Sequence, residues 1–271
     1  MTRAERAVVL ARGLGSRMRE ADPSAALTET QHRAADAGLK AMMPIGGRPF
    51  LDFALSALAD AGVRRAALVV APDHAAIREH YEDLRPSRIS IEYAVQERPL
   101  GTANAVLAAE RWTDEHPFLV LNADNIYPAA VLRSLLAAGE PSFPAFRRAD
   151  LVRHGNIKDE QVRAFALVQL DATGYLRHIV EKPPPEVVER AGDDAIVSMN
   201  CWRFDARIFP ACRDVRPSER GELELPQAVL LAVERGVRFR ALPADGGVLD
   251  LSRRADAADL SRRLADVTPR L

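Results

Sequence analysis

The sequence predicts an α/β protein with a mainly parallel, mixed sheet and helices on both of its faces. In the first half of the chain, short apolar segments typical of buried strands alternate with segments of helical periodicity. The first apolar segment, residues 7–11, breaks at Gly13 and Gly15, as a central strand does where it turns towards a helix. In the second half, two strand-like segments flank residues 171–174, whose Asp-Ala-Thr-Gly sequence favours a hairpin turn.

The individual elements follow from apolar periodicity and from residues that end helices, such as Gly62 and Gly236. Strands are expected at residues 7–11, 65–70, 89–95, 118–121, 162–170, 175–180, 196–204, 237–242 and 248–251. Helices are expected at residues 49–61, 75–81, 102–112, 128–138, 224–233 and 256–265. Ligands of parallel sheets bind beyond the carboxyl ends of the strands, where Gly13, Gln96 and Asp124 fall.

The composition is that of an ordinary globular protein: 48% of the 271 residues are apolar, 28% are charged, and the net charge is −1. Such a charge gives no general attraction for nucleic acid or an anionic membrane, so neither is expected as a partner. Cys201 and Cys212 lack the spacing of a metal or redox motif, and the first apolar run is too short for a signal or a membrane span. We expect a cytoplasmic protein with a single domain, residues 1–271; whether it forms a homo-oligomer is left open.

The loop after the first strand contains the residues of a phosphate site. Gly13 and Gly15 let backbone N–H groups approach an anion, and the guanidinium of Arg17 matches phosphate oxygens. No lysine follows these glycines as in a P-loop, and Met18 stands where a dinucleotide-binding loop has its third glycine. A different class of phosphate site is indicated, and an ordinary tight strand-to-helix turn is the alternative.

Several segments, in this order, resemble the signature of the sugar-1-phosphate nucleotidylyltransferases. They are Leu10-Ala11-x-Gly13-x-Gly15-Ser16-Arg17, Lys40-x-x-x-Pro44, Arg48-Pro49, Gln96-x-x-Pro99-x-Gly101-Thr102-Ala103, Asp124, Glu181-Lys182-Pro183, Asn200 and Leu249-Asp250-Leu251. The resemblance covers nearly the whole chain, and the order is more specific than any single motif. It implies a Rossmann-like nucleotidyltransferase fold of the GT-A type. It also implies a reaction in which an NTP and a sugar 1-phosphate give an NDP-sugar and pyrophosphate, with Mg²⁺ as cofactor.

The resemblance also assigns roles to residues. It implies that Arg17, Lys40 and Asp124 act in catalysis, and that Asp124 and Asp250 bind Mg²⁺, which prefers carboxylate and phosphate oxygens. Contacts with the nucleotide are implied for Ala11, Arg12, Gly13, Gly15, Ser16, Gln96, Gly101 and Thr102, and contacts with the sugar phosphate for Glu181, Lys182 and Asn200. Residues to about 140 would bind the nucleotide and residues from about 141 the sugar phosphate. The Gln96 carboxamide can pair with a pyrimidine edge and favours UTP or dTTP, and Thr102 can cap the helix that follows it.

The chain departs from the family pattern at several places, among them Ala123 where a glycine usually precedes the aspartate and Met199-Asn200-Cys201-Trp202 in the usually glycine-rich sugar segment. Arg12 replaces the first glycine of the usual Ala-Gly-Gly, so a long cation stands where the base lies against bare backbone. The link from Arg17 to Lys40 is longer than in the family, which indicates an inserted helix over about 22–38. Its expected span is Pro23 to Ala37, with Asp22 as cap and Gly38 as its end. This helix could be a lid over the nucleotide, or it could lie at the rim.

Three other functions stay open from the sequence alone. A glycosyltransferase of related fold would share the strand-end acid but would not need Lys40 or the Gly-Thr-Ala segment. A nucleotidyltransferase acting on a non-sugar phosphate would share the glycine loop and differ on the sugar side. A non-catalytic nucleotide-sugar sensor would explain Arg12 as a group that obstructs the site.

Overall fold

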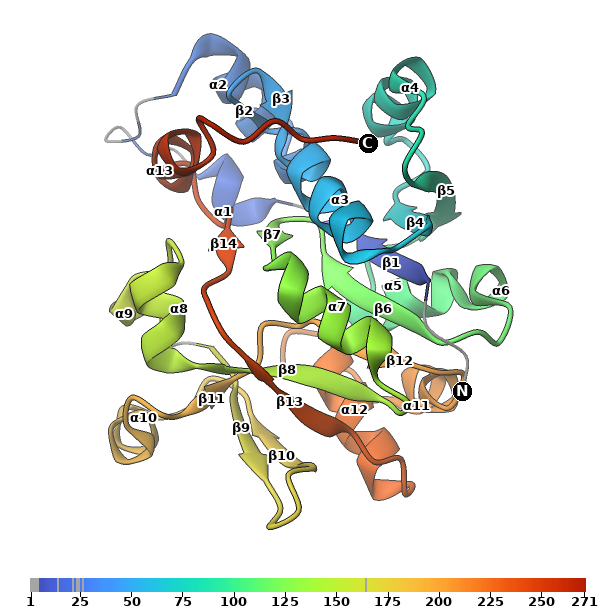
Figure 1. Cartoon of the computed structure of the whole chain (residues 1–271), viewed down its shortest axis with the longest axis vertical. Helices are drawn as coiled ribbons and strands as arrows, with labels where there is room; N and C mark the ends of the chain where they lie inside the picture. The colour runs from blue at the N-terminus through green and yellow to red at the C-terminus, as the bar shows by residue number, and fades with distance from the viewer. Residues whose placement is uncertain (1–4, 14, 21, 23–24, 26, 164) are drawn as a thin grey trace.

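The computed structural model describes residues 5–13, 15–20, 22, 25, 27–163 and 165–271. Its centre is a mixed ten-stranded sheet with the order β10-β9-β11-β8-β12-β6-β1-β4-β5, in which β13 pairs with β8 (Figure 1). The strands are β1 (Arg6–Leu10), β4 (Arg65–Val70), β5 (Ser90–Val95), β6 (Phe118–Asn122), β8 (Ser142–Arg147), β9 (Leu167–Leu170), β10 (Leu176–Val180), β11 (Ile196–Val197), β12 (Trp202–Phe204) and β13 (Arg240–Ala244). Two short pairs lie outside it: β2 (Pro44–Ile45) with β3 (Arg48–Pro49), and β7 (Asn125–Ile126) with β14 (Leu249–Asp250).

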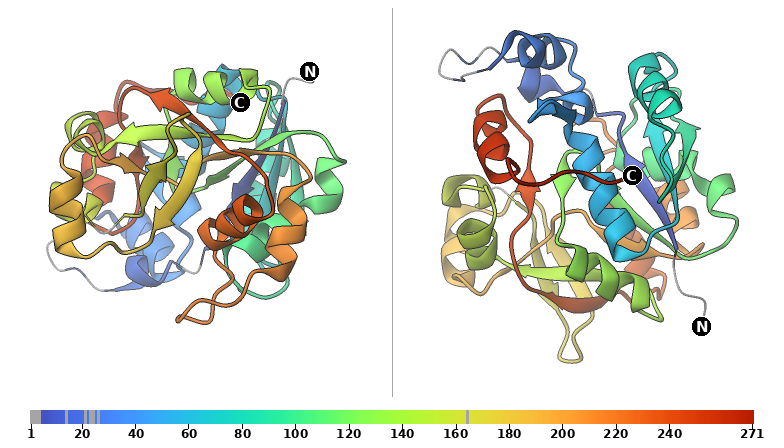
Figure 2. Two further views of the ribbon diagram at one scale, coloured as in Figure 1. Left: turned by 90° about the horizontal axis from the view of Figure 1, so that it is seen from below. Right: turned by 45° about the horizontal axis from the view of Figure 1, so that its top comes forward.

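Helices cover both faces of the sheet. They are α1 (Ser16–Arg19), α2 (Glu29–Asp36), α3 (Phe50–Ala61), α4 (Ala75–Leu84), α5 (Thr102–Ala108), α6 (Glu110–Thr113), α7 (Ala129–Ala137), α8 (Arg148–His154), α9 (Asp159–Val162), α10 (Pro185–Ala191), α11 (Ile208–Asp214), α12 (Leu225–Glu234) and α13 (Asp256–Arg263). Residues Lys40–Met42 form a 3₁₀ turn. Figure 2 shows α7 on one side of the sheet and α11 and α12 on the other.

The parallel part of the sheet places several strand ends at one edge. β1 lies between β4 and β6, parallel to both, and β5 continues this part beyond β4. In this register Leu10, near the end of β1, lies beside Val69 of β4 and Asn122 of β6. The loops that follow these strands therefore begin side by side, which is the arrangement that positions the site described below.

The rest of the sheet is largely antiparallel. β12 joins the parallel part through an antiparallel pairing with β6, and β9 and β10 form the predicted hairpin. Each face has its own apolar core. Leu51 and Leu58 of α3 pack with Leu132 of α7 on one face, and Trp202 packs with Phe204 and helices α11 and α12 on the other. Each fully buried large side chain of this kind stabilises the fold by about 1.5–3 kcal/mol.

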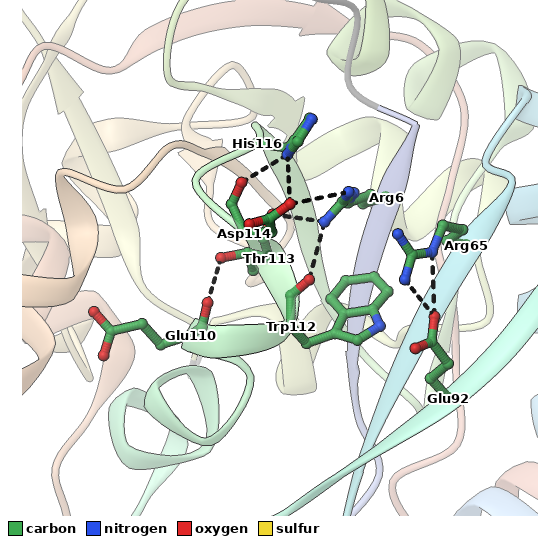
Figure 3. A network of polar contacts seen from close by, with 8 residues as sticks. All are labelled: Arg6, Arg65, Glu92, Glu110, Trp112, Thr113, Asp114 and His116. Atoms are coloured by element: carbon green, nitrogen blue, oxygen red, sulfur yellow. Dashed lines mark hydrogen bonds and ion pairs between the residues drawn. The ribbon is translucent and has the colours of Figure 1, made fainter.

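A cation–aromatic network closes the opposite edge of the sheet, at the amino ends of β1 and β4 (Figure 3). The guanidinium groups of Arg6 and Arg65 lie 5.8 and 5.5 Å from the centre of the Trp112 ring. Arg6 Nη1 also donates to the carbonyl oxygen of Thr113 at 2.8 Å, and Arg65 Nη2 lies 2.8 Å from Glu92 Oε1. The network ties α6 to the sheet at the edge away from the ends of the parallel strands.

Several predicted boundaries are wrong, each for a local reason. The strand expected at 162–170 begins only at Leu167, because Val162 ends the short helix α9. The strand expected at 196–204 is broken into β11 and β12, and Asn200 in the break has a positive φ of 52° that a strand cannot contain. The helix expected at 102–112 is divided into α5 and α6 at Ala109. The sequence reading missed β8, α8, α10 and α11 altogether.

The inserted helix is present as α2, but its predicted start is wrong. It begins at Glu29, and its cap is Thr28: the hydroxyl of Thr28 accepts from Gln31 N, and Gln31 Oε1 accepts from Thr28 N at 2.9 Å. Asp22 lies outside the helix, and Pro23 lies outside the described residues. At the other end, Gly38 takes a positive φ of 72° just after the helix, as predicted.

The helix α2 is fastened to the end of the chain. Met18, Ala35 and Leu260 belong to an apolar cluster that joins α1, α2 and α13. Within this region Arg254, which is 6% exposed, donates from Nε to the carbonyl oxygen of Met18 at 2.8 Å and from Nη2 to Asp36 Oδ1 at 2.6 Å. One buried guanidinium thus holds the glycine-loop helix and the inserted helix together.

Among the described residues, no helix has the length and apolarity needed to cross a bilayer.

We expect Arg254→Met to lower the free energy of unfolding by about 2–3 kcal/mol, because it leaves the Met18 carbonyl without its charged donor. Asp36→Asn should cost less than about 1 kcal/mol, since Asp36 is mostly exposed and an amide oxygen can still accept from Arg254. Denaturant unfolding of both variants measures the difference. Equal losses would mean that the exposed ion pair, and not the buried backbone contact, holds the two helices.

Candidate active site

A cavity of about 370 Å³ lies at the carboxyl edge of the parallel strands. Each strand of this part supplies a wall: Arg12 and Gly13 follow β1, His74 follows β4, Gln96 follows β5 and Asp124 follows β6. Other lining residues include Ala11, Gly15, Ser16, Arg17, Lys40, Gly101, Thr102, Asn122 and Glu222. The structure therefore brings together in one cavity all the residues predicted to contact the nucleotide, together with Arg17, Lys40 and Asp124.

The glycine loop is shaped by a close approach of two backbones. Gly15 has a φ of 60°, and a Cβ atom there would collide with the backbone of Gly38. Only glycine fits this position without strain. Gly13 is different, because a Cβ atom there would have no neighbour within 4 Å. The packing of the fold therefore does not require glycine at position 13, and the missing side chain leaves space in the cavity.

The cations of this loop differ in their surroundings. Within the described part of the chain, the exposed guanidinium of Arg17 makes no ion pair or hydrogen bond, so its donors are available to a ligand. Lys40 lies in the 3₁₀ turn after α2, and its Nζ is 3.4 Å from Asp124 Oδ2. Lysine and aspartate both keep partial contact with solvent, at 18% and 27% exposure of their side chains.

Asp250 is brought to Asp124 by the small sheet of β7 and β14. Asp250 pairs with Asn125 in its register, and the N–H of Leu251 donates to the carbonyl oxygen of Asp124 at 2.9 Å. Asp250 Oδ1 accepts from Asn125 Nδ2 at 2.8 Å. Burial, followed by the negative charge of Asp124, raises the pKa of Asp250 to about 7. Asp124 therefore lines the cavity, and Asp250, which does not itself line it, is buried beside Asp124.

No group of three or more His, Cys, Asp or Glu side chains suited to a metal occurs in the described residues. The donor set at Asp124 and Asp250 is consequently two carboxylates. Hard carboxylate oxygens fit Mg²⁺, which commonly binds through one or two of them and completes its shell with water and substrate phosphates. The proximity of two acids and the raised pKa of one of them fit such a cation.

The Gln96 segment forms the wall opposite the glycine loop. Gln96 is 5% exposed, and its Nε2 donates to the carbonyl oxygen of Gly101 at 3.0 Å and to Asn104 Oδ1 at 2.9 Å. A carbonyl oxygen can only accept, so this contact fixes which end of the amide is nitrogen. Both amide hydrogens are used within the protein, and Oε1 remains as an acceptor for a ligand.

Thr102 lines the cavity but does not cap its own helix, contrary to the prediction. The helix α5 has Gly101 at its N-cap position and no side-chain cap. The hydroxyl of Thr102 instead accepts from the N–H of Leu225, the first residue of α12, at 2.8 Å. Gly101 has a φ of 114°, and a Cβ atom there would meet the backbone of Leu223. The two contacts attach the segment before α12 to the wall of the cavity.

The residues predicted to bind the sugar phosphate do not line this cavity. Glu181 and Lys182 lie after β10 at the protein surface. Surrounding atoms partly shield the carboxyl group of Glu181 from water, and this desolvation, followed by the negative charge of Glu224, raises the pKa of Glu181. Asn200 is one contact away from the cavity: its Nδ2 donates to Asn122 Oδ1 at 2.9 Å. Its own Oδ1 accepts from Trp202 Nε1 at 3.0 Å, so both ends of this amide are engaged.

Sequence reasoning missed Asn122, Asn125 and His74. Asn122 Nδ2 lies 3.4 Å from Asn125 Oδ1, and Asn125 donates to Asp250, so the asparagines connect Asn200 to the late acid. Asn122 could have been predicted from the sequence, because it ends an apolar strand two residues before Asp124. His74 had none, because nothing in its segment distinguishes it from an ordinary turn.

Arg12 is held by the opposite wall. Its Nε donates to the carbonyl oxygen of Gln96 at 2.6 Å, and its Nη2 donates to that of Glu97 at 3.2 Å. Its Nη1 is buried without a hydrogen-bond partner, as is Nδ1 of the neighbouring His74. Burial lowers the pKa of His74, and the charges of Arg12 and Arg78 lower it further against the opposing effect of Asp73. His74 is therefore neutral at pH 7 beside the arginine.

Comparison with known proteins identifies the family of this chain. The sequence pattern of the family described as nucleotidyl transferase matches residues 6–251. The chain belongs to this family. Among its nucleotidyl transferase relatives, the UTP–glucose-1-phosphate uridylyltransferase AglF of Haloferax volcanii is 30% identical over 264 residues, which are 97% of each chain. A glucose-1-phosphate thymidylyltransferase of Streptomyces antibioticus is 27% identical over 98% of this chain and 68% of its own.

Solved structures share the fold of this nucleotidyl transferase. A UDP-glucose pyrophosphorylase in complex with UDP-glucose matches with a TM-score of 0.74 and 18% identity, over 98% of this chain and 100% of that one. A UTP-bound UGPase from Acinetobacter baumannii matches with a TM-score of 0.72 and 18% identity, over 99% and 95%. At these identities the likeness shows the fold alone. The predicted Rossmann-like nucleotidyltransferase fold, with its mixed sheet flanked by helices, is confirmed.

Replacing the two loop glycines should have opposite effects. We expect Gly13→Ala to leave the unfolding midpoint unchanged and to weaken NTP binding roughly tenfold, because the methyl group enters the open cavity. Gly15→Ala should lower the free energy of unfolding by about 1–2 kcal/mol or more, because its φ is positive and Gly38 is too close. Thermal unfolding and equilibrium titration of UTP separate the two. Unchanged UTP affinity in Gly13→Ala would place the nucleotide elsewhere.

Proposed function

We propose that this protein transfers a nucleotidyl group from UTP or dTTP to a sugar 1-phosphate and releases pyrophosphate. The reaction class is that of its uridylyltransferase and thymidylyltransferase relatives, and the class predicted from the sequence is confirmed at this level. The observation that carries the proposal is the convergence of four distant segments in one cavity. Arg17, Lys40, Gln96 and Asp124 all line it, although they come from the ends of different strands and loops.

The choice of base rests on Gln96 and on the relatives. The Oε1 of Gln96 is an acceptor, which the N3–H of uracil and thymine can meet; the N4 amino group of cytosine is also a donor, so the relatives carry the choice between the pyrimidines. Gly101 and Thr102, on the same segment, line the cavity beside Gln96. This polarity supports UTP or dTTP, and the presence of a uridylyltransferase and a thymidylyltransferase among the relatives is in accord with it.

The triphosphate would lie over the glycine loop. Gly13, Gly15 and Ser16 form the loop, Ala11 precedes it, and the unpaired guanidinium of Arg17 reaches the cavity from α1. The anionic oxygen of the sugar phosphate attacks the α-phosphorus in line, a new P–O bond forms, and the bond to pyrophosphate breaks. This nucleophile carries no proton that must be removed, so the side chains contribute positioning and neutralisation of charge.

We propose that Asp124 and Asp250 hold the Mg²⁺ ion. When bound, Mg²⁺ would neutralise charge that develops on the phosphate oxygens. Lys40, 3.4 Å from Asp124, is placed to contact phosphate from the side of the glycine loop. Glu181, Lys182 and Asn200 remain candidates for the sugar phosphate, outside the nucleotide cavity, and the asparagines link Asn200 to Asp250. The predicted cytoplasmic location stays a prediction.

The test is release of pyrophosphate with Mg²⁺ and a panel of nucleoside triphosphates and sugar 1-phosphates, with glucose 1-phosphate first. Release that requires both UTP or dTTP and a sugar 1-phosphate supports the proposal. Transfer of sugar from an NDP-sugar without pyrophosphate would indicate a glycosyltransferase instead. Activity with a non-sugar phosphate alone would identify a different acceptor, and nucleotide binding without turnover would identify a sensor.

Asp124→Asn and Asp250→Asn should each lower turnover by at least about a hundredfold while the protein stays folded, as loss of a charge-stabilising group does. Asp83→Asn, an exposed acid on α4, is the matched control and should have no effect. Steady-state rates at saturating Mg²⁺ provide the measurement. Near-normal Mg²⁺-dependent rates in Asp124→Asn would rule out the proposed metal site.

Lys40→Arg should lose most of the activity although it keeps the charge, because a broad guanidinium cannot replace a compact ammonium 3.4 Å from Asp124. Lys40→Ala should lose more. Lys158→Arg, at an exposed lysine far along the chain, is the control and should behave as wild type. Normal turnover in Lys40→Ala would show that Lys40 has no role in the reaction.

A further inference from the structure

Arg12 stands where the family pattern that the sequence resembles has a glycine, and two of its three guanidinium nitrogen atoms bond to the protein. Nε and Nη2 donate to the carbonyl oxygens of Gln96 and Glu97, at 2.6 and 3.2 Å. Nη1 is buried, and the charge of the guanidinium acts on His74. The side chain therefore spans from the end of β1 across the end of β4 to the end of β5, fixed along its edges.

A guanidinium held by its edges offers a ligand mainly its flat face. Arg12 still lines the cavity, so part of the side chain is open to what binds there. Planar cations stack favourably on aromatic rings, and arginine does so more effectively than lysine because its charge is spread over a plane. The other cations of the cavity wall, Arg17 and Lys40, come from the loop and turn on the phosphate side.

We propose that the Arg12 guanidinium is a platform on which the nucleobase stacks, and that it is not a phosphate ligand. This inference rests on the proposed function, because it assumes that the base lies against Gln96. The same wall then supplies two kinds of contact: Oε1 of Gln96 meets the edge of the base, and Arg12, hydrogen-bonded to the Gln96 backbone, meets its face. A residue that departs from the family pattern becomes part of base binding.

The experiment measures dissociation constants of UMP, UDP and UTP for wild type, Arg12→Ala and Arg12→Lys, with the thymidine series in parallel. A stacking contact does not depend on the number of phosphates, so Arg12→Ala should weaken all three ligands by one common factor, roughly tenfold. Arg12→Lys should fail to restore affinity, because lysine keeps the charge and lacks the plane. Arg98→Ala removes an exposed cation from the same segment as Gln96 and should change nothing.

A double-mutant cycle with Gln96→Ala tests whether Arg12 acts directly. If Arg12 stacks on the base, its removal should cost a similar factor with and without the Gln96 side chain. If Arg12 merely positions Gln96, the cost should vanish in the Gln96→Ala background. Unfolding midpoints of all variants exclude loss of structure as the cause.

Three results would overturn the inference. A loss that grows from UMP to UTP, or full rescue by Arg12→Lys, would make Arg12 a phosphate or charge contact. Unchanged affinity would place the base elsewhere, and tighter binding in Arg12→Ala would make the arginine an obstruction. The proposed function is tested separately: it fails if the wild-type protein binds no uridine or thymidine nucleotide or releases no pyrophosphate. If that activity is intact and Arg12→Ala does not change nucleotide affinity, only the inference about Arg12 fails.

Discussion

The parallel pairing of β1 with β4 on one side and β6 on the other is the constraint on which the rest of the structure depends. Its register sets Leu10 beside Val69 and Asn122, so the chain leaves three neighbouring strands at one edge of the sheet. A slip of one residue would turn every side chain of a strand to the other face of the sheet, so that each would enter the core shaped for its neighbours. The register that buries Val8 and Val9 is thus the same one that gathers Arg12, His74 and Asp124 around a cavity.

Two close backbone approaches turn that edge into a closed site. Gly15 lies against Gly38, and Gly101 lies against Leu223, at distances that no side chain could enter. The first contact joins the glycine loop to the turn that presents Lys40, and the second joins the Gln96 segment to the start of α12. The inserted helix α2 is held by Arg254, and its residues are not among those that line the cavity.

The sequence predicted the parallel half of the fold well and the other half less well, for physical reasons. Strand 65–70 was predicted with its observed bounds, because a run buried on both faces carries a continuous apolar signal. The break at Asn200 and the short helices α8 to α10 depend on tertiary contacts, which local periodicity does not encode. In the site, the glycines and the residues at strand ends could be placed from the sequence, because turns and strand ends constrain them. The hydrogen bonds from Asn200 to Asn122 and from Arg12 to the Gln96 carbonyl oxygen could not be predicted, since they join residues far apart in the chain.

The polar residues between the two acids explain how the acids can approach one another. Asp250 is buried, and the charge of Asp124 opposes its ionisation. The side chains that bond to Asp250 are neutral: Asn125 and Ser252 at its carboxylate, and Asn156 at both its N–H and its carbonyl oxygen. The nearby acid Asp256 has its carboxylate occupied by the N–H groups of Ser252 and Arg253. Neutral groups satisfy hydrogen bonds without adding charge, and the described residues hold no group of three or more His, Cys, Asp or Glu side chains that could bind a metal ion at this point. Lys40 offsets part of the negative charge of the two acids, and the remainder would suit the divalent cation that we propose for this site.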